Sequence, residues 1–580
     1  LDYNNWQENK IPLETTDNCN TLYKFSNSLF TVKSDSIVYM YNNGWKDFYV
    51  APSYANISCT DSKLLISTAK NGLISFNQDI TEDFRSKEYA LNADYDKYKN
   101  NYWIATGDGG AKKVNAEGSV NAYKVSGPAR TDAQRLIYTG GRMYLVNGRG
   151  SLVSRGTKNP TISYIENHKW ENLNPISLGI YNFVDYAFDV TSVIADPKDN
   201  SHWYFSTFGE GVFEVKDNKV IALYNTTTTN DQIPAVENNN EHTNYCDGLA
   251  VDSYGNIYTA TTIESHPISI YSPSNGWKNI IHDADCSNGW AKKYLFTSKF
   301  RLLLSVRNTP WIFLWHDNKT PFDPSDDKIK LYPASKWIDK DGKYLSPTYI
   351  HDIQEDKNGT LWAGTENGPV LFPKPQKIFD DNDYRCARVK INRNDDSGLA
   401  DYLLDGETIY AIEVDYGNRK WLGTANSGLY LVSEDGTETL AHFTKENSPL
   451  SSNTISDLEL NPKTGELFIV TADGVFSYHT DSTEPVKEAT KETIYAYPNP
   501  VRPEFSGDVV IGGLENNSNV WITDIAGNLV FKGRTVGGSL SWNCKNSKGE
   551  DVTGGVYLVL VSNENSDNPN SVATKILVVR

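Results

Sequence analysis

One pattern recurs along this chain of 580 residues and limits what the chain can fold into. In residues 350–372 and 410–431, an Asp lies six residues before Trp362 or Trp421, a Gly-Thr pair follows, and another Gly ends the unit. Weaker copies keep the aromatic, Thr and Gly positions near residues 65, 103, 144, 203, 258 and 468. A repeat of this length indicates one structural unit that buries its apolar face against its neighbours.

The unit itself predicts short antiparallel strands. Its Asp/Asn/Gly segment favours a turn, the aromatic run alternates large and small residues, and the last Gly permits a tight reversal. Spacings of 59 residues from Trp362 to Trp421 and 47 from Trp421 to Phe468 are typical of four-stranded propeller blades. An aromatic content of 12% also favours an all-β protein. We therefore expect the repeated Trp, Thr and Gly residues to form blade cores rather than ligand sites.

The number of units predicts two rings. Ten units can be counted once weak copies near residues 30 and 303 are included, which exceeds the roughly 4–8 blades of one ring. We assign residues 126–490 to a seven-bladed ring and residues 1–125 to part of a first ring, whose other blades would precede Leu1. The start LDYNNWQENK lacks a signal peptide and fits this expectation. Two five-bladed rings are the alternative.

The last ninety residues predict a different module. The charged segment 483–493 breaks the repeat and reads as a linker. Six short strand candidates follow, separated by Gly, Asn and Ser turns, which indicates an immunoglobulin-like β-sandwich over residues 491–580. A Cys…Trp…Cys arrangement is missing, which argues against an antibody-type domain.

This module carries a specific family resemblance. The segments YPNPV (497–501), ITDIAGNLV (522–530), KGEDVTGGVYLVLV (548–561) and the terminal KILVVR resemble, in order and spacing, the C-terminal signal domain of type IX secretion cargo. The motif residues are Pro498, Asn499, Pro500, Asp524, Gly527, Gly555, Tyr557 and Lys575. The blades at 350–372 and 410–431 resemble the two-component regulator propeller repeat of Bacteroidetes proteins.

Propellers followed by such a domain resemble the propeller component of the type IX secretion attachment complex. The resemblance implies an exported, non-enzymatic scaffold at the outer-membrane surface that supports the sortase, which processes cargo and links it to anionic lipopolysaccharide. The implied partners are the sortase PorU, the shuttle PorV and PorQ, with anionic lipopolysaccharide as a candidate ligand. Two alternatives are a secreted cargo with a glycan-binding or glycan-degrading propeller, and the sensor propellers of a hybrid two-component regulator.

The residues themselves offer little chemistry. No HExxH, GxSxG or P-loop motif occurs, so neither catalytic residues nor a cofactor are predicted. The net charge of −18 disfavours nucleic-acid binding, and no apolar stretch is long enough to span a bilayer. None of the six cysteines forms a CxxC pair, so they are expected as buried thiols, with a Cys246–Cys286 disulfide as the alternative.

One loop is a candidate metal site. Residues 316–328 (HDNKTPFDPSDDK) lie between the apolar run WIFLW and the run IKLY. Their carboxylates, Asp317, Asp323, Asp326 and Asp327, could together bind Ca²⁺, although EF-hand spacing is lacking. The other interpretation is a polar hairpin loop tightened by two prolines.

Overall fold

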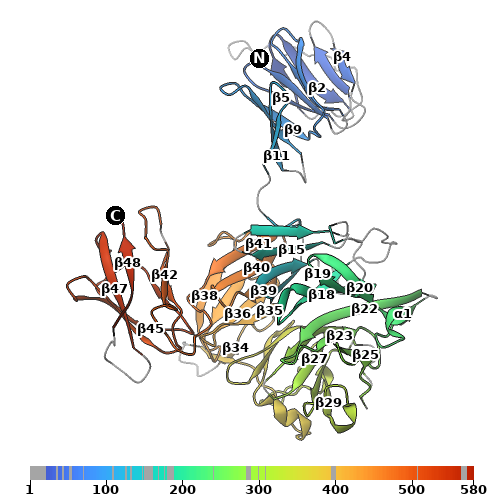
Figure 1. Cartoon of the computed structure of the whole chain (residues 1–580), viewed down its shortest axis with the longest axis vertical. Coiled ribbons are helices and arrows are strands. Elements are labelled where there is room, and N and C mark those ends of the chain that lie inside the picture. Colours follow the sequence, from blue (N-terminus) through green and yellow to red (C-terminus); the bar gives the residue numbers. More distant parts are fainter. Residues whose placement is uncertain are drawn as a thin grey trace. The chain divides into compact units, whose positions relative to one another are not determined.

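The computed structural model divides the chain into two compact units, Leu1–Gly127 and Pro128–Arg580, and each is described here by itself (Figure 1). The residues described are 21–33, 37–41, 45–50, 55–68, 71–106, 110–123, 127–130, 134–146, 148, 161–166, 169–174, 177–178, 189–238, 241–282, 286, 289–297, 299–306, 309–393, 400–505, 507–562 and 571–580.

The first unit contains three four-stranded antiparallel sheets among its described residues. The sheets are β1 (Tyr23–Phe25), β2 (Ser28–Lys33), β3 (Ile37–Tyr41) and β4 (Trp45–Val50); β5 (Ala55–Cys59), β6 (Leu64–Thr68), β7 (Gly72–Phe76) and β8 (Glu82–Ser86); and β9 (Asn92–Asp96), β10 (Asn101–Ala105), β11 (Ala111–Asn115) and β12 (Val120–Tyr123). Phe30 and Ile57 share a buried cluster between the first two sheets, and Leu65 and Tyr102 share one between the last two. Three stacked blades near residues 30, 65 and 103 are therefore present, as the repeat predicts.

Seven further blades follow in the second unit, and a short strand pairing joins the second and third into one nine-stranded sheet. The first four are β13 (Arg135–Thr139), β14 (Arg142–Val146), β15 (Ile162–Glu166) and β16 (Lys169–Leu173); β17 (Val190–Asp196), β18 (Asp199–Gly209), β19 (Gly211–Lys216) and β20 (Lys219–Tyr224); β22 (Glu241–Val251), β23 (Ile257–Thr261), β24 (Ile268–Ser272) and β25 (Gly276–Asn279); and β26 (Ala291–Phe296), β27 (Arg301–Ser305), β28 (Trp311–His316) and β29 (Lys328–Pro333). The last three are β30 (Ile350–Glu355), β31 (Leu361–Thr365) and β32 (Gly368–Phe372); β35 (Ile409–Val414), β36 (Lys420–Thr424), β37 (Leu429–Val432) and β38 (Thr439–Phe443); and β39 (Ile455–Leu460), β40 (Glu466–Thr471) and β41 (Gly474–His479). Shorter elements lie between the blades: α1 (Thr226–Thr229), β21 (Val236–Asn238), β33 (Lys390–Asn392) and β34 (Ala400–Tyr402).

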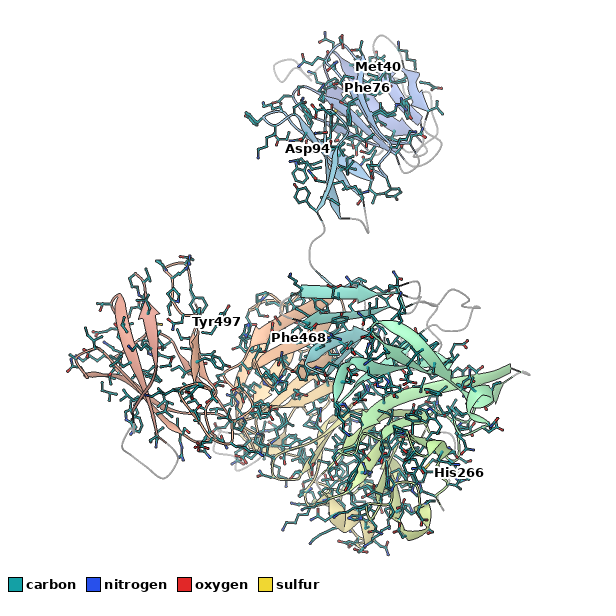
Figure 2. All side chains as sticks on the ribbon, viewed as in Figure 1. Met40, Phe76, Asp94, His266, Phe468 and Tyr497 are labelled. Atoms are coloured by element: carbon teal, nitrogen blue, oxygen red, sulfur yellow. The ribbon has the colours of Figure 1, made fainter. Side chains whose placement is uncertain are left out.

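These seven blades close into a ring. Their first strands, β13, β17, β22, β26, β30, β35 and β39, contact one another in chain order, and β39 also contacts β13. Leu136 and Leu145 of the first blade share a buried cluster with Val470 and Phe468 of the last, and Phe468 is labelled in Figure 2. The predicted seven-bladed ring is confirmed.

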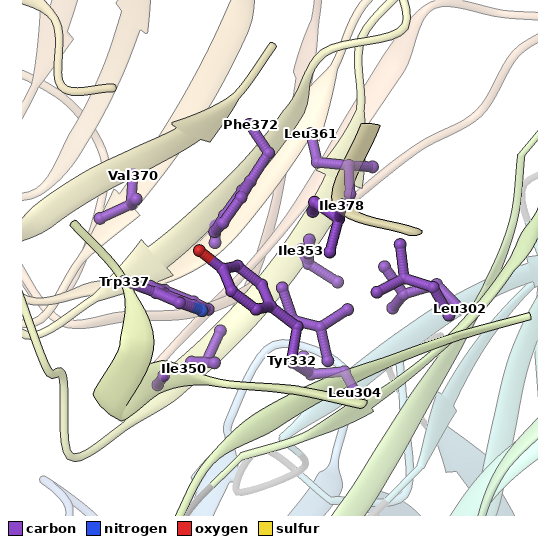
Figure 3. Close-up of a cluster of buried hydrophobic side chains, with 14 of the residues drawn as sticks. Leu302, Leu304, Tyr332, Trp337, Ile350, Ile353, Leu361, Val370, Phe372 and Ile378 are labelled. Carbon is purple, nitrogen blue, oxygen red and sulfur yellow. The ribbon is translucent and has the colours of Figure 1, made fainter. Parts of the chain in front are cut away.

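The repeated residues build the blades. Trp362 and Trp421 are 1% exposed, and Figure 3 shows a comparable aromatic core, in which Trp337 and Phe372 join the fourth and fifth blades. The repeated Thr hydroxyls each donate a hydrogen bond to the carbonyl oxygen of the repeated Gly: Thr207 to Gly211 (3.1 Å), Thr365 to Gly368 (2.8 Å), Thr424 to Gly428 (2.8 Å) and Thr471 to Gly474 (3.0 Å). At Gly428, φ is +82° and a Cβ would lie 2.2 Å from a backbone oxygen, so only glycine fits.

The C-terminal part is a β-sandwich. One sheet contains β42 (Tyr495–Tyr497), β43 (Val509–Gly512) and β46 (Leu540–Trp542), and the other contains β45 (Leu529–Arg534), β44 (Asn519–Thr523), β47 (Gly555–Ser562) and β48 (Ser571–Val578). Val509, Trp542, Val559 and Ile576, all fully buried, lie in one core to which both sheets contribute. The predicted switch from blades to a sandwich is confirmed.

Candidate functional site: the axial cavity of the seven-bladed ring

A cavity of about 730 Å³ lies on the axis of the ring, because residues from all seven blades line it. The contributing residues include Arg135, Thr191, Asp247, Lys292, His351, Tyr410 and Asp457, one from each blade. We refer to this space as the axial cavity. None of these residues was singled out by the sequence motifs.

A recurring irregularity turns side chains into the axial cavity. Five of the seven first strands have a register shift directly after their first residue. The residue skipped in each pairing lines the cavity, and these residues are Thr191, Lys292, His351, Tyr410 and Ser456. A β-bulge leaves its extra residue unpaired and re-aims the side chain, so the five bulges set the lining of the cavity.

Hydrogen bonds from side chains on the axis also connect most of the first strands to the first strand of the next blade. Five of the seven junctions between successive first strands contain such a bond: Arg135 Nη1 to Thr191 O (2.8 Å), Thr191 Oγ1 to Cys246 O (2.8 Å), Lys292 Nζ to His351 O (2.9 Å), Ile412 N to Asp352 Oδ2 (2.9 Å) and Leu136 N to Asp457 Oδ2 (2.7 Å). Each bond joins a side chain to the backbone of the neighbouring blade. The axial residues therefore hold the ring together, whatever else they do.

The charges around the cavity are partly paired. Arg135 forms an ion pair with Asp247 (2.8 Å), and Lys293 forms one with Asp352 (2.7 Å). Glu459 Oε1 accepts a hydrogen bond from the backbone N–H of Tyr138 at 3.2 Å, which is another bond across the junction of the last and first blades.

Burial shifts the protonation of several axial groups. Burial, with a contribution from Lys292, lowers the pKa of His351 to about 4, so this imidazole is neutral at physiological pH. Burial, followed by the neighbouring charge of Asp457, raises the pKa of Glu459 to about 8. Burial, and then Glu459, also raises the pKa of Glu413 well above its usual range. Glu459, which lines the cavity, and Glu413, which interacts with it, therefore resist ionisation near neutral pH.

Aromatic rings complete the site. The ring of His351 stacks on Tyr349 with centroids 5.6 Å apart and meets Tyr410 edge-on at 4.8 Å. Tyr294 also lines the cavity. The arrangement offers aromatic faces and hydrogen-bonding groups on a rigid frame, which suits a small polar ligand.

The four carboxylates of the calcium candidate have protein partners instead. Asp317 pairs with Arg301 (2.7 Å), and Asp327 pairs with His282 (2.7 Å). Asp323 accepts from the Ser325 hydroxyl (2.5 Å) and then from Ser325 N (3.1 Å), and these bonds lower its pKa. Asp326 accepts from the Thr320 hydroxyl (2.9 Å). Within the described ranges, no three or more His, Cys, Asp or Glu side chains are grouped to hold a metal ion. These partners fit the hairpin interpretation of the loop between β28 and β29, and calcium binding by the loop stays a prediction.

The signal-domain motif residues shape the sandwich. Asn499 bonds to Lys575 O (2.7 Å) and Leu577 N (3.0 Å), and it follows Pro498 and precedes Pro500, both after cis peptide bonds. Asp524 accepts backbone bonds in a turn where Gly527 has φ of +87°, and Gly555 begins β47. Tyr557 donates to Thr553 O (2.8 Å) and packs on Trp542. All eight motif residues therefore lie in the turns, the strands or the core of the sandwich.

The cysteine prediction is confirmed for part of the chain. Cys246, Cys286, Cys386 and Cys544 are buried, Cys59 is half-buried, and none of the five forms a disulfide, so the alternative of a Cys246–Cys286 disulfide is wrong. Burial raises the pKa of Cys246 to about 12, which makes it an inert thiol. Cys19 lies outside the described residues.

Comparison with known proteins identifies a repeat and a structural relative. Residues 344–367 match the two component regulator propeller family. No curated protein sequence matches the chain. In the described part of the chain, no helix has the length and apolar character needed to cross a membrane.

Solved structures extend the comparison to the whole chain. PorZ, an essential bacterial surface component of the type IX secretion system of Porphyromonas gingivalis, has a TM-score of 0.72 and 25% sequence identity, covering 97% of this chain and 75% of PorZ. The extracellular domain of a putative hybrid two component system from B. thetaiotaomicron has a TM-score of 0.38 and 13% identity, covering 98% of this chain and 76% of that chain. The chain is thus similar, in structure and over nearly its whole length, to the type IX secretion component PorZ, and it carries a two component regulator propeller repeat.

Proposed function

We propose that this chain is a non-enzymatic scaffold of the type IX secretion attachment complex at the outer-membrane surface. The observation that carries the proposal is the similarity to PorZ, which extends through the blades and the terminal sandwich alike. In this role the chain supports the sortase that processes cargo and links it to anionic lipopolysaccharide. Its partners in the proposal are PorU, PorV and PorQ.

The architecture suits such a role. The ring presents rigid, loop-rimmed faces, and its axial side chains are committed to bonds between blades. The sandwich adds a second folded surface on the same unit. Rigid surfaces lose little conformational entropy when a partner binds, which favours docking.

The test is co-purification from native outer membranes. The full chain, tagged and expressed in its own cell, should recover a sortase and a shuttle protein, identified by mass spectrometry. A tagged unrelated surface propeller, carried through the same detergent steps, is the control. Recovery of the same proteins with both baits, or of neither protein with this chain, would contradict the proposal.

A secreted glycan-binding or glycan-degrading cargo is the second candidate. The axial cavity favours it, since tyrosines and carboxyl groups of raised pKa face the same space. For such a cargo the mature surface protein should lack residues 494–580. For the scaffold, the C-terminal peptide ending at Arg580 should be found on the mature protein by mass spectrometry.

A further inference from the structure

Two consecutive blades contain the same Asp turn, in different forms. The turn between β30 and β31 reads DKNGTLW (356–362), and the turn between β35 and β36 reads DYGNRKW (415–421). In each, the Asp carboxylate accepts two backbone N–H groups at 2.9 Å, which fixes the same loop shape. The first of the two turns therefore supplies an internal reference, a turn that bonds to partners within the ring.

The second oxygen of each carboxylate has a different partner. Asp356 Oδ2 accepts from Trp362 Nε1 at 3.1 Å and pairs with Lys420 Nζ of the next blade at 3.1 Å, so both of its partners lie within the ring. Asp415 Oδ2 accepts instead from Arg419 Nε at 2.7 Å, and Arg419 Nη1 reaches Asp481 at 3.3 Å. Asp481 lies just after the last blade, so the turn of the sixth blade holds the segment that leads to the sandwich.

The other residues peculiar to this turn also face the sandwich. Gly417 N donates to Ser482 Oγ at 3.1 Å. A Cβ at Gly417 would lie 2.2 Å from Val536 Cγ1, and one at Gly537 would lie 2.5 Å from Tyr416 Cβ. The equivalent of Gly417 in the fifth blade is Asn358, whose side chain bonds within the ring to Glu434. The backbone of the turn and the sandwich therefore approach closely at residues without side chains.

The segment between ring and sandwich is bound along its backbone. Its bonds are Thr483 N to Ser539 Oγ (3.0 Å), Gly538 N to Thr483 O (2.7 Å), Ser539 Oγ to Asp481 O (2.8 Å), Glu484 N to Pro462 O (2.8 Å) and Val486 N to Leu514 O (3.0 Å). Ser482 is 0% exposed and Thr483 is 2% exposed. A protease needs an extended, accessible stretch of chain, so this junction must open before it can be cut.

We propose that the turn 415–419 is a docking element for the C-terminal sandwich, and that the docked sandwich closes the junction 481–486 to proteolytic cleavage. The segment that the sequence predicts to be a linker thus begins as an ordered junction, held by hydrogen bonds to the ring and to the sandwich. This inference deepens the proposed scaffold role, in which the module is kept, but its test uses purified protein and no partner. The docking of the sandwich can therefore be disproved while the scaffold role stands, and the scaffold role can be disproved while the docking stands.

The test is limited proteolysis of the purified full chain with an endoproteinase that cuts after Asp and Glu, with cleavage of the Asp481–Ser482 bond followed by mass spectrometry. The variant Gly417→Ala introduces a methyl group against Val536 at a position whose φ lies outside the left-handed region. We expect it to speed cleavage at the junction at least about tenfold by raising the population of the open joint. The double variant Gly417→Ala/Val536→Ala, which removes the contacted methyl, should return to within about twofold of the native rate.

Asn358→Ala is the matched control, because it changes the same position of the equivalent turn, at a side chain that bonds to Glu434 of the ring. It should leave cleavage at the junction within about twofold of the native rate. An unchanged rate in Gly417→Ala, an equal acceleration in Asn358→Ala, or no recovery in the double variant would each overturn the proposal. Thermal unfolding of all variants confirms that the ring remains folded, and cleavage spread through the ring in Gly417→Ala would also overturn it.

Discussion

Replacing Glu459 by Gln should stabilise the seven-bladed ring at high pH and leave it unchanged at low pH. Burial in the axial cavity, beside Asp457, raises the pKa of Glu459 from an ordinary 4.5 to about 8. Below the ordinary value, the group is protonated in both the folded and the unfolded chain. Between the two values, the unfolded chain ionises the group while the folded chain keeps it protonated, so stability falls as pH rises and the loss is complete above the higher value.

The size of the effect follows from the shift. A shift from 4.5 to about 8 corresponds to at most about 5 kcal/mol of stability lost well above pH 8. The side chain lines a cavity wide enough for water, which screens the charge, so we expect about 1–3 kcal/mol. The amide oxygen of Gln can still accept the bond from Tyr138 N, so the junction between the blades is kept.

The assay is guanidinium unfolding at pH 5 and pH 9, followed by tryptophan fluorescence. The free energy of unfolding of Glu459→Gln should exceed that of the native chain at pH 9 and equal it at pH 5. Glu438→Gln, at an exposed position of the sixth blade, is the control and should show no difference at either pH. An equal effect of Glu459→Gln at both pH values, or destabilisation at pH 9, would refute the reasoning.

Three further predictions concern the ring. Asp352→Asn should lower the free energy of unfolding by about 2–4 kcal/mol, because it leaves the ammonium of Lys293 without its partner; chemical denaturation at pH 7 measures this loss. Trp362→Phe should cost about 1–2 kcal/mol more than Trp421→Phe in the same assay, since only Trp362 donates an Nε1 bond to a described residue, and equal costs would contradict this. Calcium at about 1 mM should leave the melting temperature within about 1 °C, because the carboxylates of the loop 316–328 have protein partners; a rise of several degrees would restore the calcium hypothesis.

The blades could be predicted from sequence because each repeated residue has the same structural task in every copy. The Thr–Gly pair fixes a turn by a hydroxyl-to-carbonyl bond, and the aromatic residue fills the blade core. Constraints that recur in space also recur in sequence. Ten such units could be counted in the sequence, and assigning seven of them to one ring was preferred over two five-bladed rings.

The axial cavity could not be predicted in this way. Its bulged residues are Thr, Lys, His, Tyr and Ser, which share no chemistry, and only the closure of the ring brings them together. A signal existed in the aligned segments 350–354, 409–413 and 455–459, where a polar residue follows the first Ile. It becomes meaningful only when the register shift at that position is known.

The calcium candidate and the docking turn show two other limits. Closely spaced carboxylates in a loop predict a cation, yet local hydroxyl, backbone and His or Arg donors satisfy them equally well. The contact of Arg419 with Asp481 spans 62 positions of sequence, and no local pattern announces it. Arg301, His282 and Asp481 each lie outside the motif whose side chain they contact.

The way the ring closes has a consequence for how it forms. Within the described residues, all strands of the first blade come from residues 135–173 and all strands of the last from 455–479, so no sheet is shared between the two ends. The ring is therefore closed by side chains of the last blade, Asp457 and Glu459, which accept hydrogen bonds from backbone amides of the first blade. Blades can assemble one after another along the chain, without inserting an early strand into a late sheet. The bonds of Asp457 and Glu459 to the first blade can then form last.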